Sequence, residues 1–255
     1  MSLTLHSLRD GVRYAASARK RCTFRSSDPA YTAVQGGWSD GARTFMAIIR
    51  PSADGFERAR LLELAPDGTV LRESAPLPLD HANNLSYHPG WDALLVTHCQ
   101  SPDGHFNRLS LVDPADFSIR RTIDLPHPFF ALAYCAALDR FASGEWAGET
   151  LDVWDGALRP LLHVGVEKPR TLSQGMCCDA EGLCFVRSSQ NGCGPELRLY
   201  DWQCALRRVI PLALEDGVEP ESVNITPDGR TLVAGTDWRS GEGALFELEF
   251  SERNE

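Results

Sequence analysis

The stretch "SVNITPDGRTLVAGTD", residues 222–237, contains a strand, a tight turn and a second strand. We expect Asp228 and Gly229 to supply the positive φ angles of a two-residue hairpin turn. The second strand, "TLVAGTD", is nearly continuous in small or apolar residues, as expected for a strand covered on both faces. This stretch therefore predicts two neighbouring strands in the interior of a sheet.

The same hairpin pattern occurs four more times along the chain. The other copies read "GGWSDGARTFMAIIR", "NLSYHPGWDALLVTHC", "ALAYCAALDRFASGEW" and "GMCCDAEGLCFVRSS". The equivalent positions in the second strand are Phe45, Leu94, Phe141, Cys184 and Leu232, which are separated by 49, 47, 43 and 48 residues. Self-similarity at such a regular spacing indicates a repeat architecture.

A third strand follows each hairpin and alternates apolar with polar residues, as a half-buried strand does. Its equivalent positions, separated by 47, 42, 46 and 49 residues, are Leu62, Leu109, Leu151, Leu197 and Phe246. A more polar fourth segment comes next, such as "TVLRESAPL" or "SIRRTIDL". Four antiparallel strands repeated about every 45 residues are typical of a β-propeller blade.

The sequence thus predicts an all-β fold, a five-bladed β-propeller of four-stranded antiparallel blades in a single domain, 1–255. The last unit stops after its third strand, and "RKRCTFR" (19–25) precedes the first unit. We expect this N-terminal segment to pair into the last blade and so remove exposed edges. The expected blades lie at about 31–79, 80–125, 126–168, 169–213 and 214–250, the last completed by a strand within 1–27.

Two resemblances accompany this pattern. "VNITPDGRTLVAGTD" (223–237) resembles the first two strands of a blade in YVTN and WD40-type propellers, although the Gly-His and Trp-Asp signatures of WD40 blades are absent. The Gln-Gly steps at Gln35 and Gln174 resemble those that open blades in plant-type glutaminyl cyclases, which are five-bladed propellers. That family continues with Glu-Ser-Thr-Gly, where this chain has "GWSD" (37–40). The resemblance implies a propeller fold and an intramolecular cyclisation activity.

Composition and charge narrow the class of protein. The net charge of −10 and pI near 5.2 argue against nucleic acid and against an anionic membrane surface as partners. No apolar run is long enough to span a membrane, and charges interrupt the N-terminus where a signal peptide is apolar, so we expect a cytoplasmic protein. Eight cysteines without a C-x-x-C pair are expected to be reduced strand residues, and we predict no metal site and no cofactor.

Propeller topology sorts the polar residues by face. The innermost strand of each blade starts, and the second strand ends, at the same mouth of the central channel, whereas the short turns lie on the other face. The starts of the inner strands are Gln35, His81, Asn83, Asn84, Phe129, Phe130, Gln174, Glu221 and Ser222. The ends of the second strands are Arg50, His98, Glu145, Trp146, Arg187, Asp237 and Trp238. His88 belongs to a turn on the far face.

This set of residues suits acid–base chemistry on a small polar molecule or a peptide terminus. We expect Glu221 or Glu145 to act as acid or base, and His81 and His98 to transfer protons. Substrate binding is expected from Gln35, Asn83, Asn84, Phe130, Gln174, Arg187, Asp237, Trp146 and Trp238. The reaction would be of cyclase, lyase, isomerase or hydrolase type, with glutaminyl-cyclase-like cyclisation as the most concrete version.

Other interpretations of the same residues stay open. Glu221 could be held by backbone amides, and His98 with Glu145 could form a structural ion pair. A binding platform for a protein or ligand is the alternative to an enzyme, with Trp146, Trp238 and the Phe129–Phe130 pair as anchors. An ion such as calcium in the channel also stays open. We expect a small-molecule or peptide substrate and a monomer or small homo-oligomer.

Overall fold

Four-stranded antiparallel sheets repeat along the chain in the computed structural model, which describes residues 5–51, 58–99 and 106–253. The first sheet comprises β2 (Ala33–Ser39), β3 (Thr44–Ile49), β4 (Ala59–Leu64) and β5 (Val70–Glu73). The second comprises β6 (Leu85–His88), β7 (Ala93–Thr97), β8 (Arg108–Val112) and β9 (Ile119–Asp124). The third comprises β10 (Ala131–Cys135), β11 (Arg140–Gly144), β12 (Thr150–Asp155) and β13 (Pro160–Gly165).

The remaining strands form one eight-stranded sheet. Its first half comprises β14 (Leu172–Cys178), β15 (Leu183–Ser188), β16 (Glu196–Tyr200) and β17 (Leu206–Ala213). Its second half comprises β18 (Val218–Ile225), β19 (Thr231–Asp237), β20 (Glu242–Glu252) and the N-terminal β1 (Tyr14–Phe24). A short 3-10 turn, η1 (Leu5–Ser7), precedes β1. No helix in the described part of the chain is long and apolar enough to cross a membrane.

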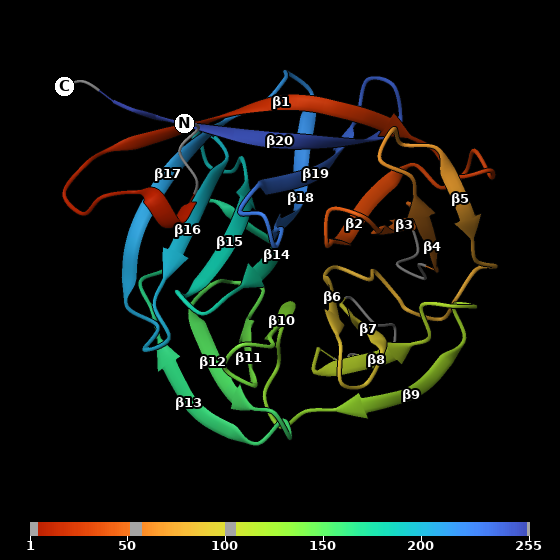
Figure 1. Ribbon diagram of the computed structural model, residues 1–255, viewed down its shortest axis with the longest axis horizontal. Helices are drawn as coiled ribbons and strands as arrows, with labels where there is room; N and C mark the ends of the chain where they lie inside the picture. The colour runs from red at the N-terminus through yellow and green to blue at the C-terminus, as the bar shows by residue number, and fades with distance from the viewer. Residues whose placement is uncertain (1–4, 52–57, 100–105, 254–255) are drawn as a thin grey trace.

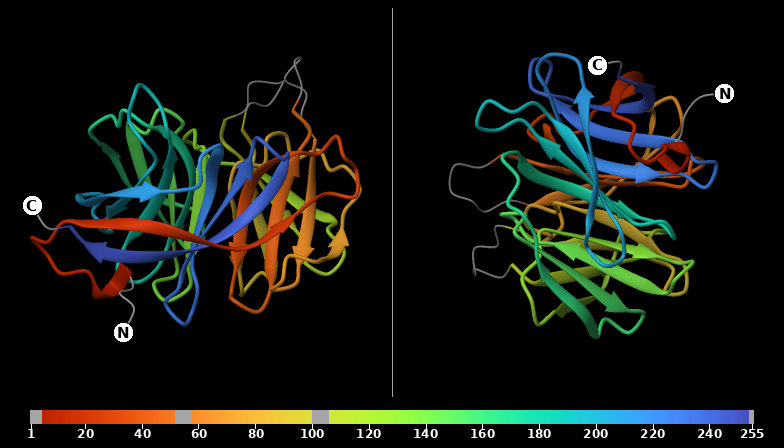
Figure 2. Two further views of the ribbon diagram at one scale, coloured as in Figure 1. Left: turned by 90° about the horizontal axis from the view of Figure 1, so that it is seen from above. Right: turned by 90° about the vertical axis from the view of Figure 1, so that its left-hand side faces the viewer.

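The N-terminal strand pairs with the C-terminal one. β1 runs antiparallel to β20 from the pair Tyr14–Glu252 to the pair Phe24–Gly243, and Figure 2 shows the two strands side by side in red and dark blue. A short parallel contact of Ala16 and Ser17 with β17 joins the two halves of the eight-stranded sheet. The expected strand within 1–27 therefore forms and lies beside the third strand of the last unit.

Five inner strands lie around the centre of the molecule (Figure 1). β2 contacts β6, β6 contacts β10, β10 contacts β14, β14 contacts β18, and β18 contacts β2. The outermost strands β5, β9, β13, β17 and β1 lie at the periphery of the same view. The inner ends of the sheets therefore meet, so side chains from different sheets can converge there.

Apolar side chains fill the space between each sheet and the next. Phe45 and Leu61 pack against Leu94 between the first and second sheets, for example. Four further clusters occupy the following intervals, and the last brings Leu232 of β19 against Met46 of β3. The second strand of each unit contributes from both faces, as β3 does with Phe45 on one side and Met46 on the other, which explains the near-continuous apolar runs of the sequence.

The hairpin turn between β18 and β19 differs in detail from the expected two-residue type. In the 222–237 stretch, Thr226 donates its N–H to the carbonyl of Arg230, which leaves a three-residue loop. Gly229 has a φ of 83°, whereas Asp228 does not adopt a positive φ. A type I turn followed by one left-handed residue fits this pattern, and it needs glycine at one position only.

Candidate functional site

Bulges at equivalent positions of three inner strands form the candidate site. The ladder of β2 shifts register between Val34 and Gly37, that of β14 between Ser173 and Met176, and that of β18 between Pro220 and Ser222. The residues inside these bulges include Gln35, Gln174 and Glu221. A bulge re-aims the side chain that it leaves unpaired, so these three positions depart from the regular alternation of the strands.

Glycines in two of the bulges allow close approach at the centre. A Cβ on Gly36 would lie 2.6 Å from the backbone carbon of Asn84. A Cβ on Gly175 would lie 2.7 Å from the carbonyl oxygen of Glu221. The Gln-Gly steps therefore have a structural reason, because only glycine lets the inner strands come this close.

Glu221 is buried, with 3% of its surface exposed. Burial raises the pKa of its carboxyl well above the ordinary value of 4.5, and the charge of Glu219 raises it further. None of the residues described in the structure hydrogen-bonds this carboxyl group. The expected alternative, a carboxylate held by backbone amides, is thus not what the described residues form, and the raised pKa favours the protonated form of Glu221.

Glu219, two residues earlier on β18, has a different environment. Gln174 Nε2 donates to its Oε1 over 3.2 Å, and Trp238 Nε1 donates to its Oε2 over 2.8 Å. Both donors come from positions that the sequence predicted to line the mouth, although Glu219 itself was not singled out. Two carboxyl groups on one strand thus differ in burial and in hydrogen bonding.

Two more mouth residues carry buried acceptors without partners. The Oε1 of Gln35 and the Oδ1 of Asn83 have no hydrogen-bond partner among the described residues. The Nδ2 of Asn83 donates weakly, at 3.4 Å, to the carbonyl of Phe130. Buried acceptors normally find a donor, so these two carbonyl oxygens are positions for water or for N–H and O–H groups of a ligand.

Asn84 crosses the centre instead of facing a ligand. Its Nδ2 donates to the carbonyl of Leu132 over 2.7 Å, and its Oδ1 accepts from the N–H of Met176 over 2.8 Å. Its side chain therefore connects the second sheet to the third and fourth.

His98 has partners other than the expected Glu145. Its Nδ1 lies 2.6 Å from Asp80 Oδ2, and its Nε2 lies 2.8 Å from Ser110 Oγ. Glu145 instead accepts a hydrogen bond from Thr150. The expected His98–Glu145 pair is thus not among the described contacts.

His81 is half-buried and lies in the loop before β6. His88, the last residue of β6, stacks against Trp91 and Tyr134, each at 3.9 Å between ring centroids.

Arg187 is buried and binds neutral oxygens. Its Nε donates to Thr171 Oγ1 over 2.8 Å, its Nη1 to Ser173 Oγ over 2.6 Å, and its Nη2 to the carbonyl of Thr171. Burial lowers the pKa of this guanidinium to about 10. Asp237 also acts locally: it accepts the N–H of Arg239, which lowers the pKa of its carboxyl.

An apolar pocket of about 490 Å³ lies at the third sheet and the connection that precedes it. It is lined by Phe106, Pro128, Phe129, Phe130, Glu145, Trp146 and Ala147. Phe130 and Trp146 form an edge-to-face pair with ring centroids 4.8 Å apart, and Trp146 is 41% exposed. Phe130 and Trp146, which were predicted to bind substrate, thus line one pocket with Glu145, which was predicted to act as acid or base.

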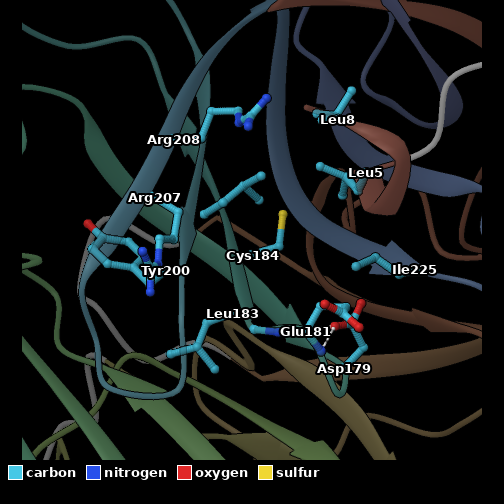
Figure 3. A pocket seen from close by; sticks show the side chains of 12 residues that line it. Leu5, Leu8, Asp179, Glu181, Leu183, Cys184, Tyr200, Arg207, Arg208 and Ile225 are labelled. Carbon is cyan, nitrogen blue, oxygen red and sulfur yellow. Dashed lines mark hydrogen bonds between the residues drawn. The ribbon is translucent and has the colours of Figure 1, made fainter. Parts of the chain in front are cut away.

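A second hollow, of about 180 Å³, lies between the N-terminal turn and β15 to β18 (Figure 3). Asp179 accepts the N–H of Glu181, and Arg207 pairs with Asp201 at 2.5 Å, whereas the buried Nη1 of Arg208 has no hydrogen-bond partner among the described residues. Its two carboxylates and two arginines belong to turns and outer strands. This hollow offers less than the mouth for binding a substrate.

A further cluster, His127, Asp152 and His163, was not singled out from the sequence. Both imidazole Nδ1 atoms lie 2.7 Å from Asp152 Oδ1. The sequence signal that could have indicated this cluster was Asp152 in "LDVWD", an acidic residue at a strand position between two core residues. Its partners could not be read from the sequence, because His127 comes from a different segment.

No protein-family model matches this chain, and no curated protein matches it. Among solved structures, it is similar to the tail fibre of Staphylococcus aureus phage P68, with a TM-score of 0.65 and 13% identity over 96% of this chain and 54% of that chain. It is also similar to a luciferin-regenerating enzyme, with a TM-score of 0.52 and 11% identity over 86% of this chain and 92% of that one. The chain thus spans about half the length of the tail fibre. At these identities the similarity shows the fold alone, which is of the β-propeller type.

Proposed function

We propose that the fold is a five-bladed propeller whose last blade is completed by β1. The cyclic contacts of β2, β6, β10, β14 and β18 support this proposal, as does the register of β1 with β20. The blades would correspond to residues 31–79, 80–125, 126–168, 169–213 and 214–250, within one domain. Of the two solved structures to which the chain is similar, one is a luciferin-regenerating enzyme and the other a phage tail fibre, so the site must decide the function.

The function that the site supports best is acid–base catalysis on a small polar molecule or peptide terminus at the mouth. The observation that carries this proposal is the pair Glu219 and Glu221. Glu221 is buried, with a raised pKa, whereas Glu219 accepts two hydrogen bonds. A neutral carboxylic acid next to a hydrogen-bonded carboxylate provides a proton donor and a proton acceptor within one site.

The orphaned acceptors indicate the chemistry of the substrate. Gln35 Oε1 and Asn83 Oδ1 lack hydrogen donors, so they favour a substrate that carries N–H or O–H groups. The apolar pocket of Phe130 and Trp146 could receive a neighbouring apolar side chain of a peptide. A substrate that carries an amine or amide group next to an apolar side chain would fit both the unpaired acceptors and the apolar pocket.

Glutaminyl cyclisation is the most concrete version of this proposal. Glu219 would take a proton from the N-terminal amine of the substrate as that nitrogen bonds to the side-chain amide carbon. The bond from that carbon to the amide nitrogen would break, and Glu221 would protonate the departing nitrogen, which leaves as ammonia. The step needs neither an oxidant nor a further reactant.

The test is a screen of small amides and short peptides, including peptides with N-terminal glutamine, with release of ammonia or loss of substrate as the readout. Glu221→Gln and Glu219→Gln are expected to reduce turnover at least about a hundredfold, the low end of acid–base contributions. Glu249→Gln, at an exposed position of β20, is the matched control. Full turnover by Glu221→Gln would remove Glu221 from the proposed role. An infrared band of a protonated carboxyl that Glu221→Gln abolishes would support it without any substrate.

A binding platform is the second candidate, favoured by the apolar pocket with its exposed Trp146 and Phe106. Peptide binding that Trp146→Ala abolishes while Glu221→Gln leaves it unchanged would support the platform. Loss of turnover in both variants would favour the enzyme, with the pocket as its substrate subsite.

A further inference from the structure

We propose that His127, Asp152 and His163 form a binding site for a divalent transition metal ion such as Zn²⁺. The site lies on the third sheet, away from the bulged inner strands, and it does not depend on the proposed function. One ligand atom from each residue lies within 4.8 Å of the other two. Two imidazole nitrogens with one carboxylate oxygen are the donor set of many zinc and iron sites.

The strand register holds two of the ligands together. Asp152 on β12 is the direct cross-strand partner of His163 on β13, so their side chains share one face of the sheet. The neighbours of Asp152 in sequence, Leu151 and Val153, face the apolar cluster on the opposite side. Asp152 is 1% exposed, which is costly for a carboxylate unless cations or donors surround it.

The third ligand comes from the connection between the second and third sheets. His127 stands between Pro126 and Pro128, and these prolines restrict the backbone on both of its sides. Its ring packs against Trp154, with 5.4 Å between the centroids. The imidazole is therefore preorganised over Asp152, as a metal ligand should be.

The distances fit a metal with little movement. Each Nδ1 lies 2.7 Å from Asp152 Oδ1. Zinc–ligand bonds of about 2.0–2.1 Å in tetrahedral geometry place ligand atoms roughly 3.3 Å apart. Small side-chain rotations would make that room. The imidazoles are partly exposed, His127 by 31% and His163 by 52%, so an ion can enter from solvent. Three protein ligands leave a fourth position for water or for a ligand.

Titration of the metal-free 255-residue chain with Co²⁺, followed by competition with Zn²⁺, tests the site. We expect one equivalent of Co²⁺ to give d–d absorption without the intense thiolate band that the eight cysteines would produce. His163→Gln, at the most exposed ligand, and Asp152→Asn are each expected to weaken binding by at least about a hundredfold, since even loss of an outer-shell partner costs 10–100-fold. His81→Gln is the matched control and should bind as the unmodified chain does.

Three results would overturn the proposal. They are the absence of binding by the unmodified chain, a spectrum dominated by thiolate coordination, and equal binding by His163→Gln and the unmodified chain. Because His163 is half exposed, its replacement is expected to leave the fold intact, and a thermal unfolding curve without metal checks this. A metal-dependent rise in Tm that His163→Gln abolishes would support the site independently.

Discussion

Gln174 and Glu219 are joined by a 3.2 Å hydrogen bond that links β14 to β18, the two end strands of the eight-stranded sheet. Trp238 holds the other oxygen of the same carboxylate. Glu219 is thereby fixed beside Glu221, which the described residues leave without a hydrogen bond. The two carboxyl groups are only two residues apart in sequence, but they differ in burial and in hydrogen bonding. The first prediction tests this difference.

Glu221→Gln is expected to change how stability depends on pH. The pKa of Glu221 is raised in the folded state above 4.5, so the folded chain holds this proton more tightly than the unfolded chain. The contribution of this tightly held proton to the stability of the folded chain is therefore present below about pH 4.5, and it is lost as pH rises toward the folded pKa. Denaturant unfolding between pH 4 and pH 8 should show stability falling less steeply for Glu221→Gln. Parallel curves for the two proteins would contradict the raised pKa.

Asn84→Ala is expected to destabilise the protein by about 2–4 kcal/mol. It would leave the buried N–H of Met176 without its acceptor and would open a small cavity. Ser86→Ala is the matched control, because Ser86 Oγ donates over 3.3 Å to the same carbonyl of Leu132, which Asn84 continues to satisfy. Its expected cost is below about 1 kcal/mol. Equal losses measured by urea unfolding would show that Asn84 does not bridge the sheets.

Arg187→Lys is expected to cost about 1–3 kcal/mol, since an ammonium cannot reproduce the three directed donors of the guanidinium. Burial should also lower the pKa of the new lysine below about 10.4, so the stability of the variant should rise with pH toward that value. Urea unfolding at pH 7 and pH 9 checks both effects. Arg19→Lys, at an exposed strand position, should change stability by less than about 0.5 kcal/mol at either pH. A neutral Arg187→Lys would show that the three hydrogen bonds contribute little.

Much of the fold was accessible from the sequence because it depends on local pattern. The period of about 45 residues predicted four strands in each unit. The last unit has only three strands up to Phe250, which predicted that the N-terminal segment pairs with it. The same topology placed Gln35, Gln174 and Glu221 at equivalent positions. The bulges were not predictable, because they arise from the close approach of inner strands.

The pairings within the site were harder to predict because they join distant segments. His98 meets Asp80 from the preceding loop, and Asn84 is held by backbone groups of two other sheets. His127 contacts Asp152 because the connection between the second and third sheets packs against the third sheet. Alternation places a side chain on a face, but the groups that reach it from another sheet follow from tertiary packing.

Removal of residues 1–25 is expected to unfold the protein. The deletion would remove β1, including the buried rings of Tyr14 and Phe24, and would expose the backbone edge of β20. Burial of two such rings contributes roughly 1.5–3 kcal/mol each, and the lost strand pairing adds to this, against a total stability of about 5–15 kcal/mol. Circular dichroism and amide NMR spectra of the shortened chain measure the effect. A synthetic peptide covering residues 10–27 should restore the folded spectrum, whereas the same peptide with Ala18→Pro, which blocks the ladder at its centre, should not. A shortened chain that stays folded without the peptide would show that β1 is not needed to complete the last sheet.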